Sequence, residues 1–350
     1  MIKEVFKQLM KDKFILLGLI YLALFFADFL SPYTKDFSDR TMAYVPPSKI
    51  FIIDENKKLS KPYTYNYIRN FDEENLRITY DFDRSQKHYV KFFAKGQPYK
   101  FLGIIPMERH LITTDADGRL FLLGTDINGR DVFSRLLFGG RISMTIGFLA
   151  LFVLFPIGLL YGGIAGYFGG IVDTLMMRFA EAVMSIPSFY LLIILASILP
   201  SGMTSIQRFM LIVIILALIG WAGFARVVRG MVLSIKNQEF VQAAKSIGAS
   251  RLRIIIKHIL PQTASFVIVA MTLSVPSYIL SESGLSFLGL GIQQPDASWG
   301  NMLKEAQEYT NIIYRPWLLT PGFLIFVAVL AFNLIGDTIR DVLDPKSKVR

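Results

Sequence analysis

Apolar residues in this chain of 350 residues gather into long unbroken runs rather than into amphipathic stripes. Each run is close in length to the ~20 helical residues that are needed to cross the hydrocarbon core of a bilayer. The six predicted spans are residues 14–30, 142–165, 179–199, 209–228, 263–281 and 317–335. We therefore expect an all-α integral membrane protein, and an even number of spans places both termini on one side.

Basic residues in the short loops fix the expected orientation. One side carries sixteen, in the N-terminal segment, at Arg178, between residues 226 and 257, and in the C-terminal tail including Lys346, Lys348 and Arg350. The other side carries only Arg208, Lys304 and Arg315. Cytoplasmic loops are enriched in Lys and Arg, so the first side, with both termini, is predicted to be cytoplasmic. The first apolar run lacks a small-x-small cleavage pattern and is interpreted as an uncleaved anchor.

The overall composition excludes several functions. The net charge of +10 comes from basic residues that flank spans, which argues against a nucleic-acid role. There is no cysteine, and the three histidines fit no metal-ligand spacing. No phosphate-binding G-x-x-x-x-G-K-[ST] loop occurs, so any ATP hydrolysis must come from another polypeptide. No nucleophile and base can be paired, which leaves a membrane-embedded enzyme unsupported.

Composition divides the chain at two points, into residues 1–30, 31–123 and 124–350. The middle part mixes Tyr, Phe, Lys and Asp, has no run long enough to span, and is predicted to be a small β-containing insert outside the cytoplasm. Strands are expected at 89–93 and 99–102 around a turn at 95–98, and at 111–113 and 120–122 around 115–118. Asp115 and Asp117 fit an ordinary turn better than a calcium loop.

A polar and basic segment, residues 239–261, lies between the fourth and fifth spans; we call it the elbow. Its apolar residues recur at helical spacing in two groups, which are Phe240, Ala243, Ala244 and Ile247, then Leu252, Ile255, Ile256 and Ile259. Gly248 can end the first helix in the left-handed conformation, and the Ser250 hydroxyl can cap the second. The pattern predicts a helix-turn-helix, either lying on the membrane surface or docking on a partner.

Three further features concern the spans. Gly158, Gly162 and Gly166 recur every four residues, which predicts close packing of the second span on another helix. Pro156, Pro187 and Pro276 interrupt three spans. After residues 124–131, the apolar residues from Val132 to Leu137 predict a short amphipathic helix at the outer interface, separate from the second span.

Glu282 and Ser286 lie at the outer end of the fifth span. Ionisable groups in a span are costly and face protein or water, so these residues are candidates for a substrate path. Glu282 would meet the amino terminus of a peptide or cap a bend in the chain.

The elbow resembles the cytoplasmic loop of ABC-importer permeases, with Gln242, Ala243, Ala244, Gly248, Leu260 and Pro261 at the family spacing. Gln242 stands where the family usually has Glu, and His258 where it usually has Ile. Glu239, one turn earlier, would supply the negative charge instead. The resemblance implies that Glu239, Gln242, Ala243, Ala244, Gly248, Leu260 and Pro261, within a loop of about 230–262, couple the permease to an ATPase.

Further motifs are similar to the dipeptide, oligopeptide and nickel subfamily of these permeases. They are GTDINGRD at residues 124–131, LSFLGLG at 285–291, SWG at 298–300, and FNLIGD at 332–337 with the tail residues Leu343, Asp344 and Pro345. Together with the elbow they extend over residues 123–345. The insert lies outside this resemblance.

The resemblance implies the fold and partners of a type I importer permease with six transmembrane helices. These are a second homologous permease subunit, two ATPase subunits that hold ATP and Mg, and an extracytoplasmic substrate-binding protein, in a bacterial inner membrane. The chain itself would bind no cofactor and import dipeptides or oligopeptides. Nickel or another small solute is the alternative cargo, and a passive channel or scaffold is the alternative class.

Overall fold

The computed structural model describes residues 2–54, 57–73, 77–115, 117–200 and 202–343. Its backbone forms two compact units, which are described separately. The helical unit contains residues 2–17, Met144–Gly291 and 325–343, and the mixed unit contains Gly18–Ser143 and Ile292–Leu324. The division at residues 30 and 123 stays a prediction. Asp344, Pro345, Lys346, Lys348 and Arg350 of the tail, and Ala116 of the predicted turn, lie outside the described residues.

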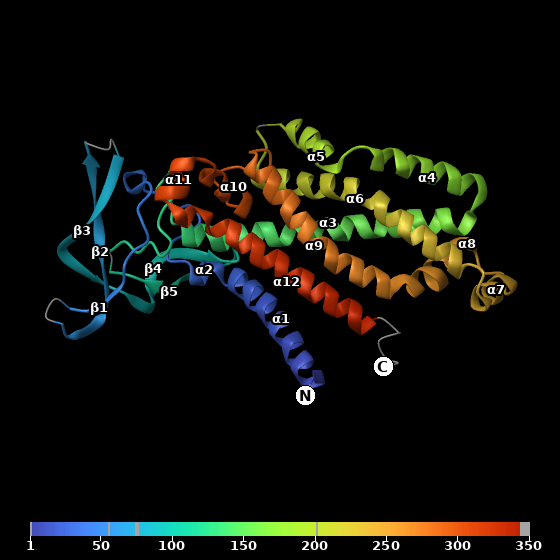
Figure 1. Cartoon of the computed structure of the whole chain (residues 1–350), viewed down its shortest axis with the longest axis horizontal. Helices are drawn as coiled ribbons and strands as arrows, with labels where there is room; N and C mark the ends of the chain where they lie inside the picture. The colour runs from blue at the N-terminus through green and yellow to red at the C-terminus, as the bar shows by residue number, and fades with distance from the viewer. Residues whose placement is uncertain (1, 55–56, 74–76, 116, 201, 344–350) are drawn as a thin grey trace. The chain divides into compact units, whose positions relative to one another are not determined.

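Five strands form the insert within the mixed unit (Figure 1). They are β1 (Phe51–Ile53), β2 (Leu59–Asp72), β3 (Arg77–Tyr89), β4 (Lys91–Phe101) and β5 (Ile105–Thr113). Strands β1, β2 and β3 make one antiparallel sheet in that order, and β4 pairs with β5 in a separate antiparallel hairpin. Tyr33, Val45, Tyr67 and Phe121 form a buried cluster that joins the first sheet to the flanking segments.

The predicted strands of the insert were partly wrong. Residues 95–98 lie inside β4, where the pairing with β5 is irregular, and the turn instead falls at residues 102–104. Residues 120–122 form no strand, and β2 and β3 were missed. Both long strands contain many polar residues with irregular alternation, so the period of two is weak in the sequence.

The mixed unit also contains one part of a long helix and several short helices. They are α1 (Ile2–Phe25, from Gly18 on), α2 (Ala27–Leu30), η1 (Arg40–Met42), α10 (Trp299–Leu303), η4 (Lys304–Gln307), α11 (Tyr309–Tyr314) and η5 (Pro316–Leu319). Trp299 is buried, its backbone N–H donates to Ser143 Oγ at 3.1 Å, and its indole N–H donates to the Leu136 carbonyl at 2.9 Å. The SWG motif therefore anchors the loop after the fifth span to the start of α3.

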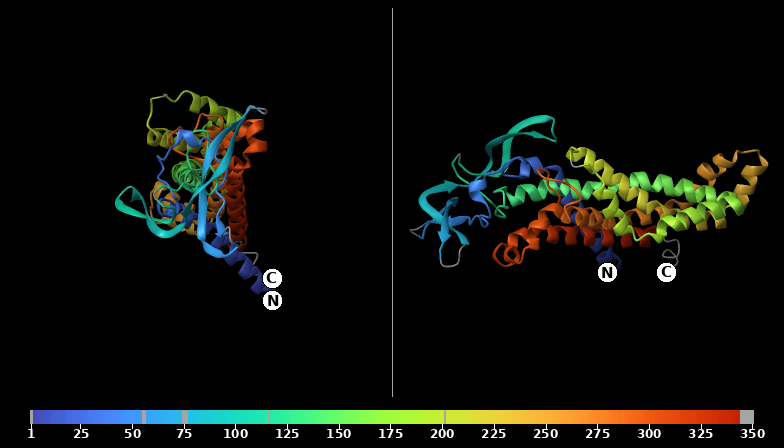
Figure 2. Two further views of the ribbon diagram at one scale, coloured as in Figure 1. Left: turned by 90° about the vertical axis from the view of Figure 1, so that its left-hand side faces the viewer. Right: turned by 90° about the horizontal axis from the view of Figure 1, so that it is seen from above.

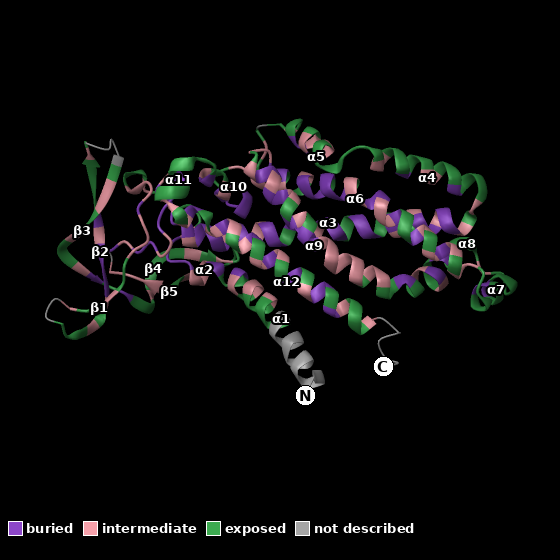
Figure 3. Cartoon of the chain, viewed as in Figure 1, coloured by how far each residue is buried: buried purple, intermediate pink, exposed green. Residues whose placement is uncertain are grey.

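The helical unit consists of long apolar helices joined by shorter ones. They are α3 (Val132–Phe168, from Met144 on), α4 (Gly170–Ser185), α5 (Ser188–Ser197), α6 (Ser205–Ile235), α7 (Glu239–Ser246), α8 (Arg251–Arg253), η2 (Ile254–Ile259), η3 (Leu260–Thr263), α9 (Ala264–Phe287) and α12 (Thr320–Leu343, from Ile325 on). Helix α4 lies beside α6 (Figure 2). Buried positions concentrate along α3 and α6 (Figure 3).

Within the described residues, four helical segments are long and apolar enough to cross a membrane. They are Val132–Phe168, Ser205–Ile235, Arg251–Phe287 and Pro316–Leu343. The predicted third span is a pair, α4 and α5, bent by 77° at the break that contains Pro187. The predicted first span is represented by the shorter apolar stretch Phe14–Phe25 of α1. In the part of the chain that the structure describes, four of the six predicted spans are therefore full-length helices and one is a bent pair, while the first is an apolar helix shorter than a full span.

One expectation about the spans is corrected and another is confirmed. The predicted interface helix after residue 131 is not a separate element, because α3 runs unbroken from Val132 to Phe168. Its first turns are buried at Val132, Leu136 and Leu137, so protein contacts replace the expected membrane surface. The interruption predicted at Pro187 is present: α4 ends at Ser185 and α5 begins at Ser188, because proline lacks a backbone donor.

Candidate functional site

The elbow begins with α7 and a well-formed helix end. Gly248 has φ +78°, its N–H donates to the Lys245 carbonyl at 3.0 Å, and the Ala249 N–H donates to the Ala244 carbonyl at 3.1 Å. These two hydrogen bonds form a Schellman motif, which requires a left-handed residue and so favours glycine. A Cβ at Gly248 would meet no heavy atom within 4 Å, so only the backbone conformation constrains this position.

The second half of the elbow continues directly into the fifth span. Segments α8, η2, η3 and α9 follow one another without a break, and together they form the helical run Arg251–Phe287. Residues Ile254–Ile259 form a π-helical turn within it, a local irregularity often found at functional positions. Ser250 occupies the cap position as expected, but its hydroxyl makes no capping hydrogen bond. Any displacement of this half acts directly on α9.

The buried face of α7 differs from the predicted one. Val241 and Ala244 are buried, whereas Phe240 and Ala243 are exposed and Ile247 is 84% exposed. Figure 3 shows α7 exposed over most of its surface. Their hydrophobicity predicted a core face of Phe240, Ala243 and Ile247, but in this chain Ile247 is largely uncovered and Phe240 is 36% exposed. Exposed apolar groups on a polar loop are typical of a docking surface.

The same division applies to the second half of the elbow. Ile255 and Ile259 are buried as expected, and Ile254 is buried too. Leu252 and Ile256 are exposed, contrary to the predicted face. The exposed cations of this segment are Lys245, Arg251, Arg253 and Lys257. The outward surface of the elbow therefore combines exposed apolar side chains with the positive charges of Arg253 and Lys257.

The inward surface fixes the elbow to two long helices. Val241, Ala244, Ile254 and Ile259 form one buried cluster with Val228 and Val232 of α6. Lys245 lies over the Tyr167 ring at 5.6 Å and Arg251 over the Phe168 ring at 5.5 Å, both at the end of α3. Cation–π contacts at exposed sites contribute roughly 0.5–1 kcal/mol each. The elbow is thus packed on α6 and held to α3, rather than attached by a flexible linker.

The residues that the resemblance assigned to coupling divide between these two surfaces. Ala244 is buried and Leu260 packs on the same cluster. The remaining ones, which are Glu239, Gln242, Ala243, Gly248 and Pro261, are exposed. Gln242 donates weakly to the Lys236 carbonyl at 3.4 Å, so its amide faces the start of the loop.

The glycine row of the second span lies against α6. An added Cβ would lie 2.6 Å from the Phe224 ring at Gly158, 2.3 Å from the Ala225 carbonyl oxygen at Gly162, and 2.8 Å from the Arg229 carbonyl oxygen at Gly166. Contacts this short leave no room for a methyl group. The row allows the backbones of α3 and α6 to approach closely, as small residues do in membrane helices.

Sequence reasoning missed one ionic contact of this helix group. Arg229 on α6 donates to Asp173 on α4, with Nε at 2.8 Å from Oδ1 and Nη2 at 2.5 Å from Oδ2. Bidentate pairs of this kind are directional and stronger than single contacts. The sequence did contain one signal for this pair. Asp173 lies in the first turn of an apolar helix, and Arg229 lies in the basic stretch that follows the fourth predicted span.

Glu282 and Ser286 lie in the interior of the helical unit. Both are fully buried, and the Ser286 hydroxyl donates to Glu282 Oε1 at 2.6 Å. A Cβ at Gly291 would lie 2.1 Å from Ser286 Oγ, so the end of the LSFLGLG segment packs directly against Ser286. A substrate reaches Glu282 only if these neighbours separate. The substrate-path assignment stays a prediction.

The GTDINGRD motif forms a buried ionic cluster in the mixed unit, which sequence reasoning also missed. Arg130 Nε donates to Asp126 Oδ2 at 2.6 Å, and Arg135 Nε lies 3.4 Å from the same oxygen. Arg130 Nη2 lies 3.7 Å from Glu305 Oε1. Burial and the nearby Asp126 carboxylate raise the pKa of Glu305. The cluster joins the start of α3 to the loop after the fifth span.

Asp131 caps the start of α3 from a fully buried position. Its Oδ2 accepts hydrogen bonds from the Ser134 N–H at 2.7 Å and the Ser134 hydroxyl at 2.6 Å. Burial raises the pKa of Asp131 to about 7. Among the described residues, no group of three acidic or histidine side chains is placed to hold a metal ion.

Comparison with known proteins gives a consistent assignment. Residues 158–349 match the family model described as binding-protein-dependent transport system inner membrane component. The chain is 46% identical over 225 residues to the dipeptide transport system permease protein DppC of Bacillus subtilis, covering 64% of this chain and 68% of that protein. It is 45% identical over 226 residues to the oligopeptide transport system permease protein OppC of Haemophilus influenzae, covering 64% and 70%.

Two further comparisons extend this set. The glutathione transport system permease protein GsiD of Escherichia coli is 42% identical over 226 residues, covering 64% of this chain and 72% of that protein. Among solved structures, a chain of the inward-facing MetNI methionine ABC transporter matches with a TM-score of 0.44 and 18% identity, covering 60% of this chain and 96% of that chain. The long apolar helices and the matched family model identify the chain as a multi-pass protein of the binding-protein-dependent transport system inner membrane component family.

Proposed function

We propose that this chain is the permease subunit of an ABC importer that moves dipeptides or oligopeptides across the bacterial inner membrane. The family match and the dipeptide, oligopeptide and glutathione permeases among its relatives support this substrate class. The chain provides the membrane path and performs no chemistry itself. ATP and Mg belong to partner subunits.

The exposed apolar surface of the elbow carries the proposal. Phe240, Ile247 and Leu252 project from a loop that is otherwise polar and basic, while the opposite side of the loop is buried on α6. Leaving large apolar groups in water costs free energy, about 25 cal/mol for each Å². A groove on an ATPase subunit would cover these groups, and Arg253 and Lys257 beside them fit an acidic rim.

The partners follow from that role. A second, related permease would complete the path, two ATPase subunits would each receive an elbow, and an extracytoplasmic binding protein would deliver the peptide. Both termini and the elbow would lie in the cytoplasm, and the insert on the opposite side. Closure of the ATPase subunits on ATP would displace the elbow, and the continuous run Arg251–Phe287 would transmit that displacement to α9.

Reconstitution with defined cargo tests the proposal. The complex is purified with its associated subunits, placed in liposomes, and supplied with its binding protein and with labelled di- and oligopeptides or nickel. We expect uptake of peptide that requires ATP. Peptide flux that is independent of ATP would support the channel alternative, and ATP-dependent uptake of nickel but not of peptide would support the small-solute alternative.

A further inference from the structure

The β4–β5 hairpin of the insert ends in an apolar tip. Residues 101–105 read Phe-Leu-Gly-Ile-Ile, and Leu102 and Ile105 are exposed while Ile104 is 80% exposed. Leu102 adopts φ +51°, a turn conformation that favours Gly, Asn or Asp. A turn in water is expected to be polar. An apolar side chain at such a position is better explained by an apolar environment.

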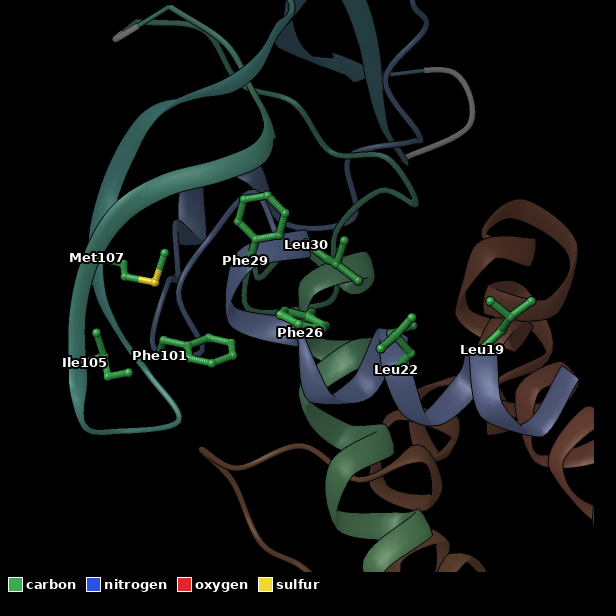
Figure 4. A pocket seen from close by; sticks show the side chains of 9 residues that line it. Leu19, Leu22, Phe26, Phe29, Leu30, Phe101, Ile105 and Met107 are labelled. Carbon is green, nitrogen blue, oxygen red and sulfur yellow. The ribbon is translucent and has the colours of Figure 1, made fainter. Parts of the chain in front are cut away.

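This tip lies beside the apolar residues of α1. Phe101 stacks on Phe26 with ring centroids 5.7 Å apart, and it meets the edge of Phe25 at 5.8 Å. Between the two elements runs a groove of about 740 Å³ (Figure 4). Leu19, Leu22 and Phe26 line one wall, and Phe101, Ile105 and Met107 line the other.

The groove is continuous with the surface by which α1 would face lipid. Leu19 and Phe26 are seven residues apart, about 10 Å along a helix, and both fall within the predicted first span. Leu19, Leu22 and Phe25 are exposed, as expected of side chains that contact hydrocarbon. The hairpin tip therefore lies level with residues that belong inside the bilayer.

Polar contacts hold the tip in this position. The Leu102 N–H donates to Asp28 Oδ2 at 3.3 Å, and Arg141 Nη2 donates to the same carboxylate oxygen at 2.7 Å. Arg141 Nε also donates to the Leu24 carbonyl at 2.6 Å, at the end of α1. Lys100 is exposed at the base of the tip, and the long side chain of a lysine can reach phosphate headgroups from such a position.

We propose that the β4–β5 hairpin is a membrane anchor of the insert. Its tip lies in the leaflet on the insert's side of the membrane, and the groove between the hairpin and α1 holds an acyl chain of a phospholipid from that leaflet. The proposal depends on membrane location alone and not on the transported substrate. A second permease subunit covering the same face is the competing outcome.

Site-specific quenching tests the position of the tip. Because the chain has no cysteine, Ile104→Cys gives it a single site for an environment-sensitive fluorophore, and the unsubstituted complex labelled in parallel corrects for cysteines of other subunits. The complex is reconstituted in phosphatidylethanolamine–phosphatidylglycerol liposomes with lipids spin-labelled along the acyl chain. The control is Leu59→Cys, at the start of β2, where the side chain is 88% exposed.

We expect spin-labelled lipid to quench the label at residue 104 severalfold more than the label at residue 59. Equal quenching with a water-like emission at both sites would overturn the proposal. An apolar emission at residue 104 without quenching by lipid would also overturn it, and would identify protein as the cover.

Native mass spectrometry tests the groove separately. Ala23 lines the groove, so Ala23→Trp fills it, whereas Leu16→Trp adds an indole to an exposed position of α1 that does not line it. The Ala23→Trp complex is expected to lose a bound phospholipid that the unchanged and Leu16→Trp complexes retain. Identical phospholipid occupancy in all three complexes would contradict the acyl-chain site.

Discussion

The guanidinium of Arg229 holds both carboxylate oxygens of Asp173, with Nε 2.8 Å from Oδ1, and so ties α6 to α4. Helix α6 also packs on the glycine row of α3 and on the buried side of the elbow. These contacts converge on the last turns of one helix. A displacement of the elbow is therefore expected to move α3, α4 and α6 together, rather than to be absorbed in a loose loop.

A double-mutant cycle measures the contribution of this pair. Asp173→Ala and Arg229→Ala should each lower the thermal midpoint of the purified chain in nanodiscs. The double variant should lose less stability than the sum of the two single losses. We expect a coupling free energy of about 1 kcal/mol, because the Arg229 side chain is 34% exposed and partly screened. The exposed pair Arg178 and Glu181 is the control, with a coupling near zero. Additive effects at Asp173 and Arg229 would refute the role of the pair.

Close packing at Gly162 gives a second prediction. The change Gly162→Val places a Cβ within 2.3 Å of the Ala225 carbonyl oxygen, so the two helices must separate. Overpacking of this kind costs about 1–3 kcal/mol or more, and the thermal midpoint should fall. Gly230→Ala is the control, because a Cβ there meets nothing within 4 Å and Ala favours a helix by roughly 0.5–1 kcal/mol. Equal midpoints for the two variants would show that the row does not limit packing.

The raised pKa of Asp131 predicts that the stability of the chain depends on pH. Its pKa in the folded chain is about 7, above the ordinary value of 3.8, so the folded state keeps a proton that the unfolded state loses as pH rises between these values. The free energy of unfolding contributed by this group therefore falls from about pH 4 to pH 7 and then levels off. Asp131→Asn keeps an acceptor for Ser134 and should flatten this decline in thermal midpoints measured from pH 5 to pH 8.

Asp115 provides a control of opposite sign. A hydrogen bond from Lys91 lowers the pKa of Asp115 below its ordinary value. Stability from this carboxylate is present above the ordinary value and is lost as pH falls through the folded-state pKa. Asp115→Asn should therefore lower the midpoint near pH 7 without removing the decline that Asp131 causes. Burial also raises the pKa of Glu305, so part of the decline should remain in Asp131→Asn. A decline of undiminished size in that variant would contradict the assignment.

Variants at Gly248 distinguish the effect of backbone strain from the effect of side-chain contact. A β-branched residue in the left-handed conformation costs roughly 1–2 kcal/mol, so Gly248→Val should distort the helix end, while Asn tolerates that conformation. Because a Cβ at this position meets no atom, neither change should prevent membrane insertion. We expect Gly248→Val to reduce substrate moved per ATP hydrolysed and Gly248→Asn to retain it. Equal coupling ratios for both variants would argue against a role for this turn.

The sequence predicts some features of the elbow and not others, for physical reasons. Helical spacing and Gly248 are local signals, and they correctly predict two helical segments separated by a left-handed turn. The buried face was predicted wrongly, because hydrophobicity does not distinguish a side chain that packs on its own chain, such as Val241, from one that awaits a partner, such as Ile247.

Longer-range features were harder to predict. Pro187 was recognised as an interruption, yet nothing local indicates that the break bends the segment by 77°. The contact between Asp173 and Arg229 joins residues 56 positions apart, and no sequence period reports such a pair. The first sheet of the insert was missed because its long strands alternate polar and aromatic residues irregularly.

The central claim is that the outward surface of the elbow receives an ATPase subunit, and Ile247→Asp tests it most directly. Ile247 is 84% exposed, so the change should leave folding and insertion intact while placing a charge in the proposed contact. Leu59→Asp, at a position that is 88% exposed in the mixed unit, is the matched control. We predict that Ile247→Asp abolishes both copurification of the ATPase and ATP-dependent uptake, while Leu59→Asp retains them. Normal uptake by the Ile247→Asp complex would contradict the account.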